Sequence, residues 1–145
     1  MIPLRDSPKT HRFPIVNISI IILNIAVFLW MLSLNQRQLL DFSYSGGLIP
    51  ANFTQNLLVG NPLAAIIPLI TYQFLHGGWV HLLGNMLYLW VFGDNIEDRL
   101  GHGTYLLFYL AVGGIAGLFQ IFFNPASTVP IVGASGAVAG ILGAY

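Results

Sequence analysis

Three polar residues stand in apolar surroundings where their chemistry could matter: His81, Asn85 and Ser135. His81 and Asn85 belong to the run HLLGNMLYLWVF, residues 81–92. Because four residues make about one helical turn, their side chains stack on one face of a helix. A polar pair on a lipid-immersed helix normally faces the bundle interior or a wet cavity. The pair therefore either bonds neighbouring helices together or belongs to a reaction site.

Ser135 lies within Gly133-Ala134-Ser135-Gly136, directly after a predicted turn and at the start of a predicted helix. Unpaired backbone N–H groups and the positive end of the helix dipole favour a developing negative charge at such a place. The serine is therefore either a nucleophile or only the N-cap of its helix. It does not match an α/β-hydrolase elbow, because that pattern needs glycine where Ala137 stands.

The composition predicts an integral membrane protein. Of the 145 residues, 56% are hydrophobic and 7% are charged, whereas soluble domains carry about 25% charged residues. Five basic and five acidic residues leave no basic surface for nucleic acid. The absence of cysteine excludes disulfides and thiolate metal sites. We expect no cofactor and no bound metal, and the lipid bilayer as the surroundings.

The hydrophobic pattern predicts an all-α bundle with three complete spans and an incomplete fourth. Residues 14–34 are apolar over a length that crosses a bilayer core of about 30 Å. Residues 79–95 and 105–123 are the second and third spans, and residues 131–145 are the fourth. The fourth stretch makes only about 22 Å of helix, so we expect a fragment of a longer protein.

The remaining segments complete a single membrane domain, residues 14–145, which follows a polar N-terminal segment, residues 1–13. Residues 35–78 are expected to form an external loop. Their first part, residues 35–61, mixes polar residues with glycine and proline and is typical of a loop lying on the membrane. The apolar residues 62–75 are interrupted by Pro68 and suit a re-entrant or interfacial piece better than a span.

Small and polar residues within the apolar stretches are expected to pack helices together. Gly113 and Gly117 permit close approach to the third span. The fourth helix carries a glycine face, for which we expect a partner helix outside this chain: Gly133, Gly136, Gly140 and Gly143. Polar residues of the first span are expected to serve packing rather than chemistry: Asn17, Ser19 and Asn24.

The combination of motifs is more specific than any one of them. In order, the chain has an external loop, an apolar His-x-x-x-Asn helix, a charged junction and a Gly-Ala-Ser-Gly helix start. The stretches HGGWVHLLGNMLYLWVFGDNIEDRLG, residues 76–101, and VGASGAVAG, residues 132–140, closely resemble the rhomboid family of intramembrane serine proteases. The resemblance extends over residues 14–145. It implies a multi-pass endopeptidase that cleaves transmembrane protein substrates through a Ser–His dyad.

The resemblance also implies a role for each site residue. Ser135 resembles the family's nucleophile, in the Gly-x-Ser-Gly motif that begins at Gly133. His81 and Asn85 resemble the side chains that form the oxyanion hole together with the backbone N–H of Ser135. One such donor contributes about 2.7–4 kcal/mol to catalysis. Three further residues match recurring positions for which the resemblance implies structural roles: His76, Glu97 and Arg99.

Two departures from the family pattern bear on activity. The family's general base is a histidine on a later helix, and no histidine follows Ser135 here. A serine hydroxyl without a base is a weak nucleophile, so we expect residues 1–145 alone to be inactive. The family's first loop often carries a Trp-Arg pair, whereas residues 35–61 contain no tryptophan and one basic residue, Arg37.

Other function classes explain the same residues less well. The main alternative is an inactive rhomboid-like protein that binds transmembrane clients, but many such relatives lose the serine that stands here at Ser135. A metal site of His76, His81 and His102 lacks an HExxH motif, and His102 lies at the opposite end of the second span. A transporter would need paired broken helices or midplane carboxylates, which the pattern does not show.

The orientation of the chain follows from its basic residues. Three of the five precede the first span: Arg5, Lys9 and Arg12. The positive-inside rule then places the N-terminus in the cytoplasm, and we expect the membrane to be a bacterial plasma membrane. Residues 93–103 are cytoplasmic in this arrangement, and residues 35–61 and 124–130 are external. His81 and Ser135 then share the outer side.

This orientation can be tested with single cysteines, because the natural sequence contains none. Cysteines that replace Ser43 or Ser127 should react with a membrane-impermeant thiol reagent added from outside the cell. A cysteine that replaces Thr104, beside the predicted cytoplasmic junction, should react only after the membrane is opened. Labelling of the first two positions from the cytoplasmic side alone would contradict both the orientation and the shared site.

Overall fold

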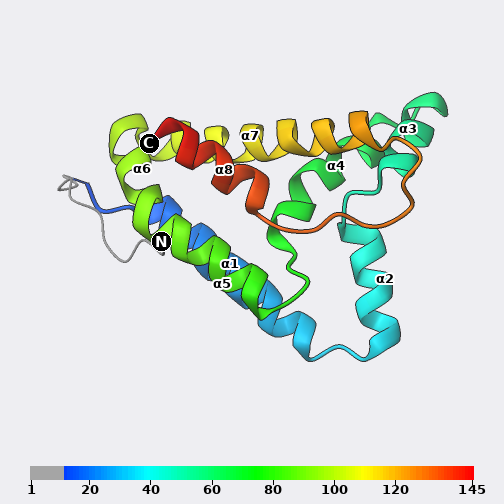
Figure 1. Cartoon of the computed structure of the whole chain (residues 1–145), viewed down its shortest axis with the longest axis horizontal. Coiled ribbons are helices and arrows are strands. Elements are labelled where there is room, and N and C mark those ends of the chain that lie inside the picture. Colours follow the sequence, from blue (N-terminus) through cyan, green and yellow to red (C-terminus); the bar gives the residue numbers. More distant parts are fainter. Residues whose placement is uncertain (1–11) are drawn as a thin grey trace.

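The chain folds into a bundle of helices (Figure 1). A computed structural model describes residues 12–145, so of the predicted N-terminal segment only Arg12 and Phe13 are described. The elements are α1 (Ile15–Leu32), α2 (Gln36–Gly46), α3 (Pro50–Leu58), α4 (Pro62–Thr71), the 3₁₀-helix η1 (Tyr72–Phe74), α5 (Trp79–Tyr88), the π-helix η2 (Leu89–Gly93), α6 (Asp94–Leu100), α7 (His102–Phe123) and α8 (Ser135–Ala144). Residues 12–145 contain no β-strand, and one isolated bridge joins Leu48 to Ile131. The predicted all-α fold is confirmed.

Two helices, α1 and α7, are long and apolar enough to cross a membrane. The stretches Pro62–Phe74 and Trp79–Leu100 pass the same test as a pair, but an 86° bend separates them. The described residues therefore hold two spans, or three if the bent pair is one span. α8, with 10 residues, is shorter than a span. Many large apolar side chains, such as Leu107 and Phe122, are exposed, as in a lipid-facing surface.

The N-terminus of α1 is capped by a buried carboxylate from a distant helix. Glu97 of α6, only 1% exposed, accepts hydrogen bonds from the backbone N–H groups of Val16 (2.9 Å) and Asn17 (2.7 Å). These N–H groups belong to the first turn of α1, where no intrahelical acceptor exists, and the helix dipole favours a negative charge. The structural role expected for Glu97 is thus confirmed. Arg99 is exposed and forms no ion pair within residues 12–145.

Asn17 links α1 to two further elements. Its amide nitrogen donates to the carbonyl of Leu89 in η2 (2.9 Å), and its amide oxygen accepts from the hydroxyl of Tyr105 in α7 (2.8 Å). A π turn departs from the regular α-helical ladder, which opens a carbonyl to an outside donor. A Cβ atom at Gly93 would overlap the Asn17 amide, so only glycine fits there. The packing role expected for Asn17 is confirmed.

The second predicted span continues further than its sequence pattern indicated. Helical backbone runs through η2 and α6 to Leu100, beyond residue 95. The charged residues of α6 are compatible with helix because Asp94 and Glu97 lie in its first turn and Arg99 in its last. The helix ends at Gly101, whose φ of 79° lies in the left-handed region that favours glycine. The chain turns there directly into α7.

The loop expected at residues 35–61 contains two short helices, α2 and α3. The composition did not indicate these helices, because their signals are local capping residues. Asn35 and Gln38 form a reciprocal capping box at the start of α2. Pro50 lies in the first turn of α3, where a backbone N–H would have no acceptor within the helix, so proline loses no hydrogen bond there. α4 and η1 then lead to the 86° bend before α5, which agrees with the predicted re-entrant or interfacial piece.

The glycines of α7 admit side chains from the bent segment. The bent segment is Pro62–Phe74, before α5. A Cβ at Gly113 would overlap the amide of Gln73, and a Cβ at Gly117 would lie 3.2 Å from a methyl group of Leu69. Gln73 is fully buried and donates to the carbonyls of Leu69 (2.8 Å) and Leu110 (3.2 Å). The close approach expected at the two glycines is confirmed, and it fixes the bent segment against α7.

The glycine face of α8 has its partner within this chain. A Cβ at Gly136 would collide with the side chain of Ala116, and a Cβ at Gly140 with that of Val112, both on α7. The expectation that this face lacks a partner helix was therefore wrong for these two glycines. The sequence could not show that α8 runs back along α7, as Figure 1 does. No heavy atom of a neighbouring element lies within 4 Å of a Cβ atom added at Gly143.

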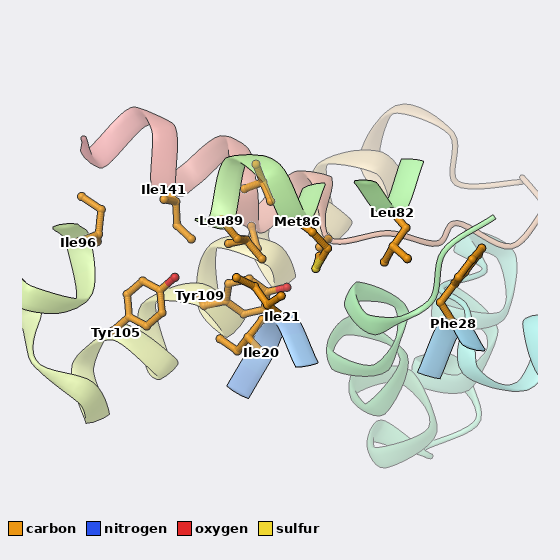
Figure 2. Packing of buried hydrophobic residues seen from close by; sticks show 13 residues of the cluster. Ile20, Ile21, Phe28, Leu82, Met86, Leu89, Ile96, Tyr105, Tyr109 and Ile141 are labelled. Carbon is orange, nitrogen blue, oxygen red and sulfur yellow. The ribbon is translucent and has the colours of Figure 1, made fainter. Parts of the chain in front are cut away.

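A single core joins the helices that carry the polar motif residues (Figure 2). Tyr105 and Tyr109 of α7 are completely buried among residues of α1 and η2, such as Ile20 and Leu89. Ile141 of α8 belongs to the same cluster. Because α1, α5, α7 and α8 share this core, the start of α8 is held beside the start of α5.

The cap at α1 predicts a stability effect of Glu97→Ala. The substitution leaves two buried N–H groups without an acceptor, and each such group costs about 1–3 kcal/mol. We expect the free energy of unfolding to fall by about 2–4 kcal/mol, measured by titration with SDS in mixed micelles. Arg99→Ala, an exposed change on the same helix, should stay within about 0.5 kcal/mol of the wild type. Equal stability of the two variants would contradict the cap.

The α7–α8 contact predicts opposite effects of two similar substitutions. Gly140→Ala forces a methyl group into Val112 and should lower the free energy of unfolding by about 1–3 kcal/mol, as overpacking does. Gly143→Ala meets open space and should leave stability unchanged or raise it by up to about 1 kcal/mol, because alanine favours helix. The same unfolding titration checks both variants. A lower free energy of unfolding for both variants would contradict the prediction, because the loss would then not depend on contact with α7.

Candidate active site

Ser135 is the first residue of α8, and the preceding loop is fixed from two sides. Leu48 and Ile131 exchange two backbone hydrogen bonds of 3.0 and 2.8 Å. The N–H of Gly133 donates to the carbonyl of Tyr72 at 2.8 Å. The Tyr72 hydroxyl in turn donates to the carbonyl of Gly113 in α7 at 2.6 Å. The turn that presents Ser135 is therefore held by the segment before α5 and by α7.

Gly133 meets two requirements that only glycine satisfies. Its φ of 125° lies in the region that side chains disfavour. An added Cβ would also overlap the ring of His81, which lies directly against the Gly133 backbone. The structure thus brings His81 to the turn that leads into Ser135, although fifty residues separate the two motifs in the sequence.

Ser135 itself is exposed on the surface of the described residues. Its backbone N–H belongs to the first turn of α8 and has no intrahelical acceptor by position. The helix dipole adds a partial positive charge at the same place. These features favour an anion that forms beside Ser135.

Asn85 lies one turn beyond His81 on α5 and is 7% exposed. Its amide nitrogen is 3.0 Å from Nε2 of His76, a buried contact between side chains. His76 comes from the break between η1 and α5, and its ring meets that of His81 edge-on, with 5.1 Å between ring centroids. His81, Asn85 and His76 therefore form one cluster, which touches the Gly133 turn through His81.

The sequence interpretation assigned His76 a structural role and did not place it beside Asn85 and His81. The available signal was the pattern His-Gly-Gly-Trp-Val-His at residues 76–81. The helix breaks between η1 and α5, and His76 folds back beside α5, where it contacts Asn85. Spacing alone could not show this, because the direction of a side chain in such a break depends on tertiary contacts.

The other described histidine lies far from the cluster, in the charged junction. His102 at the start of α7 contacts Glu97, with Nδ1 and Oε1 2.5 Å apart. Within residues 12–145, no hydrogen bond joins Ser135 to a histidine, and no group of three or more His, Cys, Asp or Glu residues could hold a metal ion. The cluster can donate hydrogen bonds to an anion, but it does not show a base paired with Ser135.

The sequence matches one protein family and several curated proteins. The family model described as "Rhomboid domain" matches residues 64–145. Rhomboid protease GluP of Bacillus subtilis is 43% identical over 76 residues, which cover 52% of this chain and 14% of that protein. Rhomboid protein 1, mitochondrial, of Saccharomyces cerevisiae is 30% identical over 142 residues, which cover 94% of this chain and 37% of that protein.

A third relative, the putative rhomboid protease YdcA of Bacillus subtilis, is 39% identical over 77 residues, or 53% of this chain and 38% of that protein. The matches thus span between 14% and 38% of the length of these three relatives. No solved structure matches the chain.

Proposed function

This chain belongs to the rhomboid family, and on that premise we propose that it forms part of an intramembrane serine endopeptidase. Ser135 is the proposed nucleophile, and His81 and Asn85 are the proposed oxyanion donors. The observation that supports this most strongly is the contact of the His81 ring with Gly133 of the Gly-x-Ser-Gly turn. The proteases named among the relatives give further support.

In the proposed reaction, the Ser135 oxygen attacks the carbonyl carbon of a peptide bond, and its proton passes to a histidine base. The carbonyl oxygen becomes an oxyanion, which accepts hydrogen bonds from His81, Asn85 and the backbone N–H of Ser135. Fixed donors in a water-poor site stabilise this charge more than water does. The amine leaves with the proton from the base, and water then releases the acyl group from Ser135.

The proposal requires a base that residues 12–145 do not place at Ser135. We propose the Ser–His dyad of the family for the protein as its gene encodes it, with this chain contributing the nucleophile and the oxyanion donors. The alternative is an inactive rhomboid-like protein that binds transmembrane clients. Ser135 in an intact motif favours the protease.

The proposed substrates are transmembrane segments of other proteins. Ser135 is exposed at the end of a helix whose surroundings are apolar, so a peptide bond reaches it from within or beside the bilayer. The protein is an integral membrane protein. We further propose a bacterial plasma membrane, on the basis of the two relatives from Bacillus subtilis, with the N-terminus in the cytoplasm.

The test is cleavage of a quenched-fluorescence peptide that contains a transmembrane segment, by the protein as its gene encodes it. Ser135→Ala should abolish cleavage and labelling by a fluorophosphonate. His81→Ala and Asn85→Ala should each lower kcat by ~10²–10³-fold, the usual effect of removing an oxyanion donor. Ser33→Ala, which removes another exposed serine hydroxyl, should retain the wild-type rate.

Two outcomes would count against the proposal. Full cleavage by Ser135→Ala would rule out the nucleophile. A wild-type protein that binds the peptide but neither cleaves it nor reacts with the fluorophosphonate would support the client-binding alternative.

A further inference from the structure

His76 is a buried side chain that forms a hydrogen bond with a proposed oxyanion donor. It is 1% exposed, and its Nε2 lies 3.0 Å from the amide nitrogen of Asn85. Its other ring nitrogen, Nδ1, is buried and has no hydrogen-bond partner within residues 12–145. Burying an imidazole with one nitrogen unpaired is unfavourable. Because this unpaired nitrogen costs stability, a contribution to stability alone does not explain a histidine at position 76.

The hydrogen bond restricts how Asn85 can act. A carboxamide nitrogen carries two N–H groups. When His76 Nε2 accepts one of them, the plane of the amide is fixed and the second N–H remains available for another acceptor. Without this partner, the amide of Asn85 could rotate about its χ2 angle, which has a broad energy profile.

His76 also contacts the second proposed donor. Its ring meets that of His81 edge-on at 5.1 Å, with an angle of 65° between the planes. The ring of His81 also lies against the Gly133 backbone. His81 thus contacts both His76 and the turn that presents Ser135. His76 itself comes from outside α5, in the break that follows η1.

We propose that His76 is a positioning residue for the oxyanion site. It fixes the amide of Asn85 by a hydrogen bond and limits the ring of His81 by contact, so that both donors are oriented before a substrate binds. Preorganised donors stabilise a transition state because they need not reorient during the reaction. This inference rests on the proposed function, and it assigns His76 a role in turnover rather than in stability alone.

A double-mutant cycle tests the inference. Wild type, His76→Ala, Asn85→Ala and the double variant are compared in one detergent, with kcat and KM measured separately on the quenched-fluorescence transmembrane peptide. His76→Ala should lower kcat by ~10–10²-fold and change KM by less than ~3-fold, as expected for an interaction that matters in the transition state. In the Asn85→Ala background, His76→Ala should lower kcat by less than ~5-fold, because the side chain that His76 orients is already absent.

Two further variants separate positioning from stability. His76→Gln keeps a buried amide that can bond to Asn85, so it should retain more of the wild-type kcat than His76→Ala. Asn24→Ala removes another fully buried polar side chain, on α1, and should leave kcat within ~3-fold of the wild type whatever its effect on stability. If His76→Ala does not fold, His76→Leu, which fills the space without a hydrogen-bond acceptor, and its double variant with Asn85→Ala supply the same cycle.

The outcomes distinguish this inference from the proposed function. If Asn85→Ala loses activity but the folded His76 variant without a hydrogen-bond acceptor keeps the wild-type kcat, the positioning role is wrong and the protease remains. Equal loss on removing His76 in both backgrounds would also overturn the positioning role. If Ser135→Ala and Asn85→Ala cleave like the wild type, the proposed function itself fails.

Discussion

Lipid is as apolar as the side chains it surrounds, so the hydrophobic effect alone cannot hold these helices together. Each buried polar group must instead find its partner within the protein. The carboxylate of Glu97 on the first turn of α1 meets this constraint most directly. Asn17 meets it by bonding to both η2 and α7. These contacts fix α1 against the helices that carry the site.

Small residues complete the arrangement that the polar contacts begin. Gly113 and Gly117 admit the bent segment to α7, while Gly136 and Gly140 bring α8 against the same helix. Tyr72 joins these contacts, because its hydroxyl bonds to α7 and its carbonyl bonds to Gly133. The position of the turn before Ser135 is therefore a consequence of helix packing, which is why a loop residue can be held with the accuracy that a reaction site needs.

The functional picture is a site made of two halves that meet at Gly133. One half is the start of α8, with Ser135, its N–H and the helix dipole. The other half is the start of α5, where His81 and Asn85 are supported by His76. In the proposed reaction the first half supplies the nucleophile and the second supplies the oxyanion donors, so neither half accounts for that reaction by itself. Membership of the rhomboid family agrees with this division.

The sequence by itself determined the class of protein, the apolar helices, the spacing of His81 and Asn85, and the serine at a helix start. These follow from composition and from helical periodicity, which are local properties. Only the tertiary structure decided that α8 packs on α7 and that His76 joins Asn85 and His81. The physical reason is that the partner of a side chain depends on which helices share a core. The sequence pattern of a glycine face or of a buried histidine does not identify the helix that it contacts.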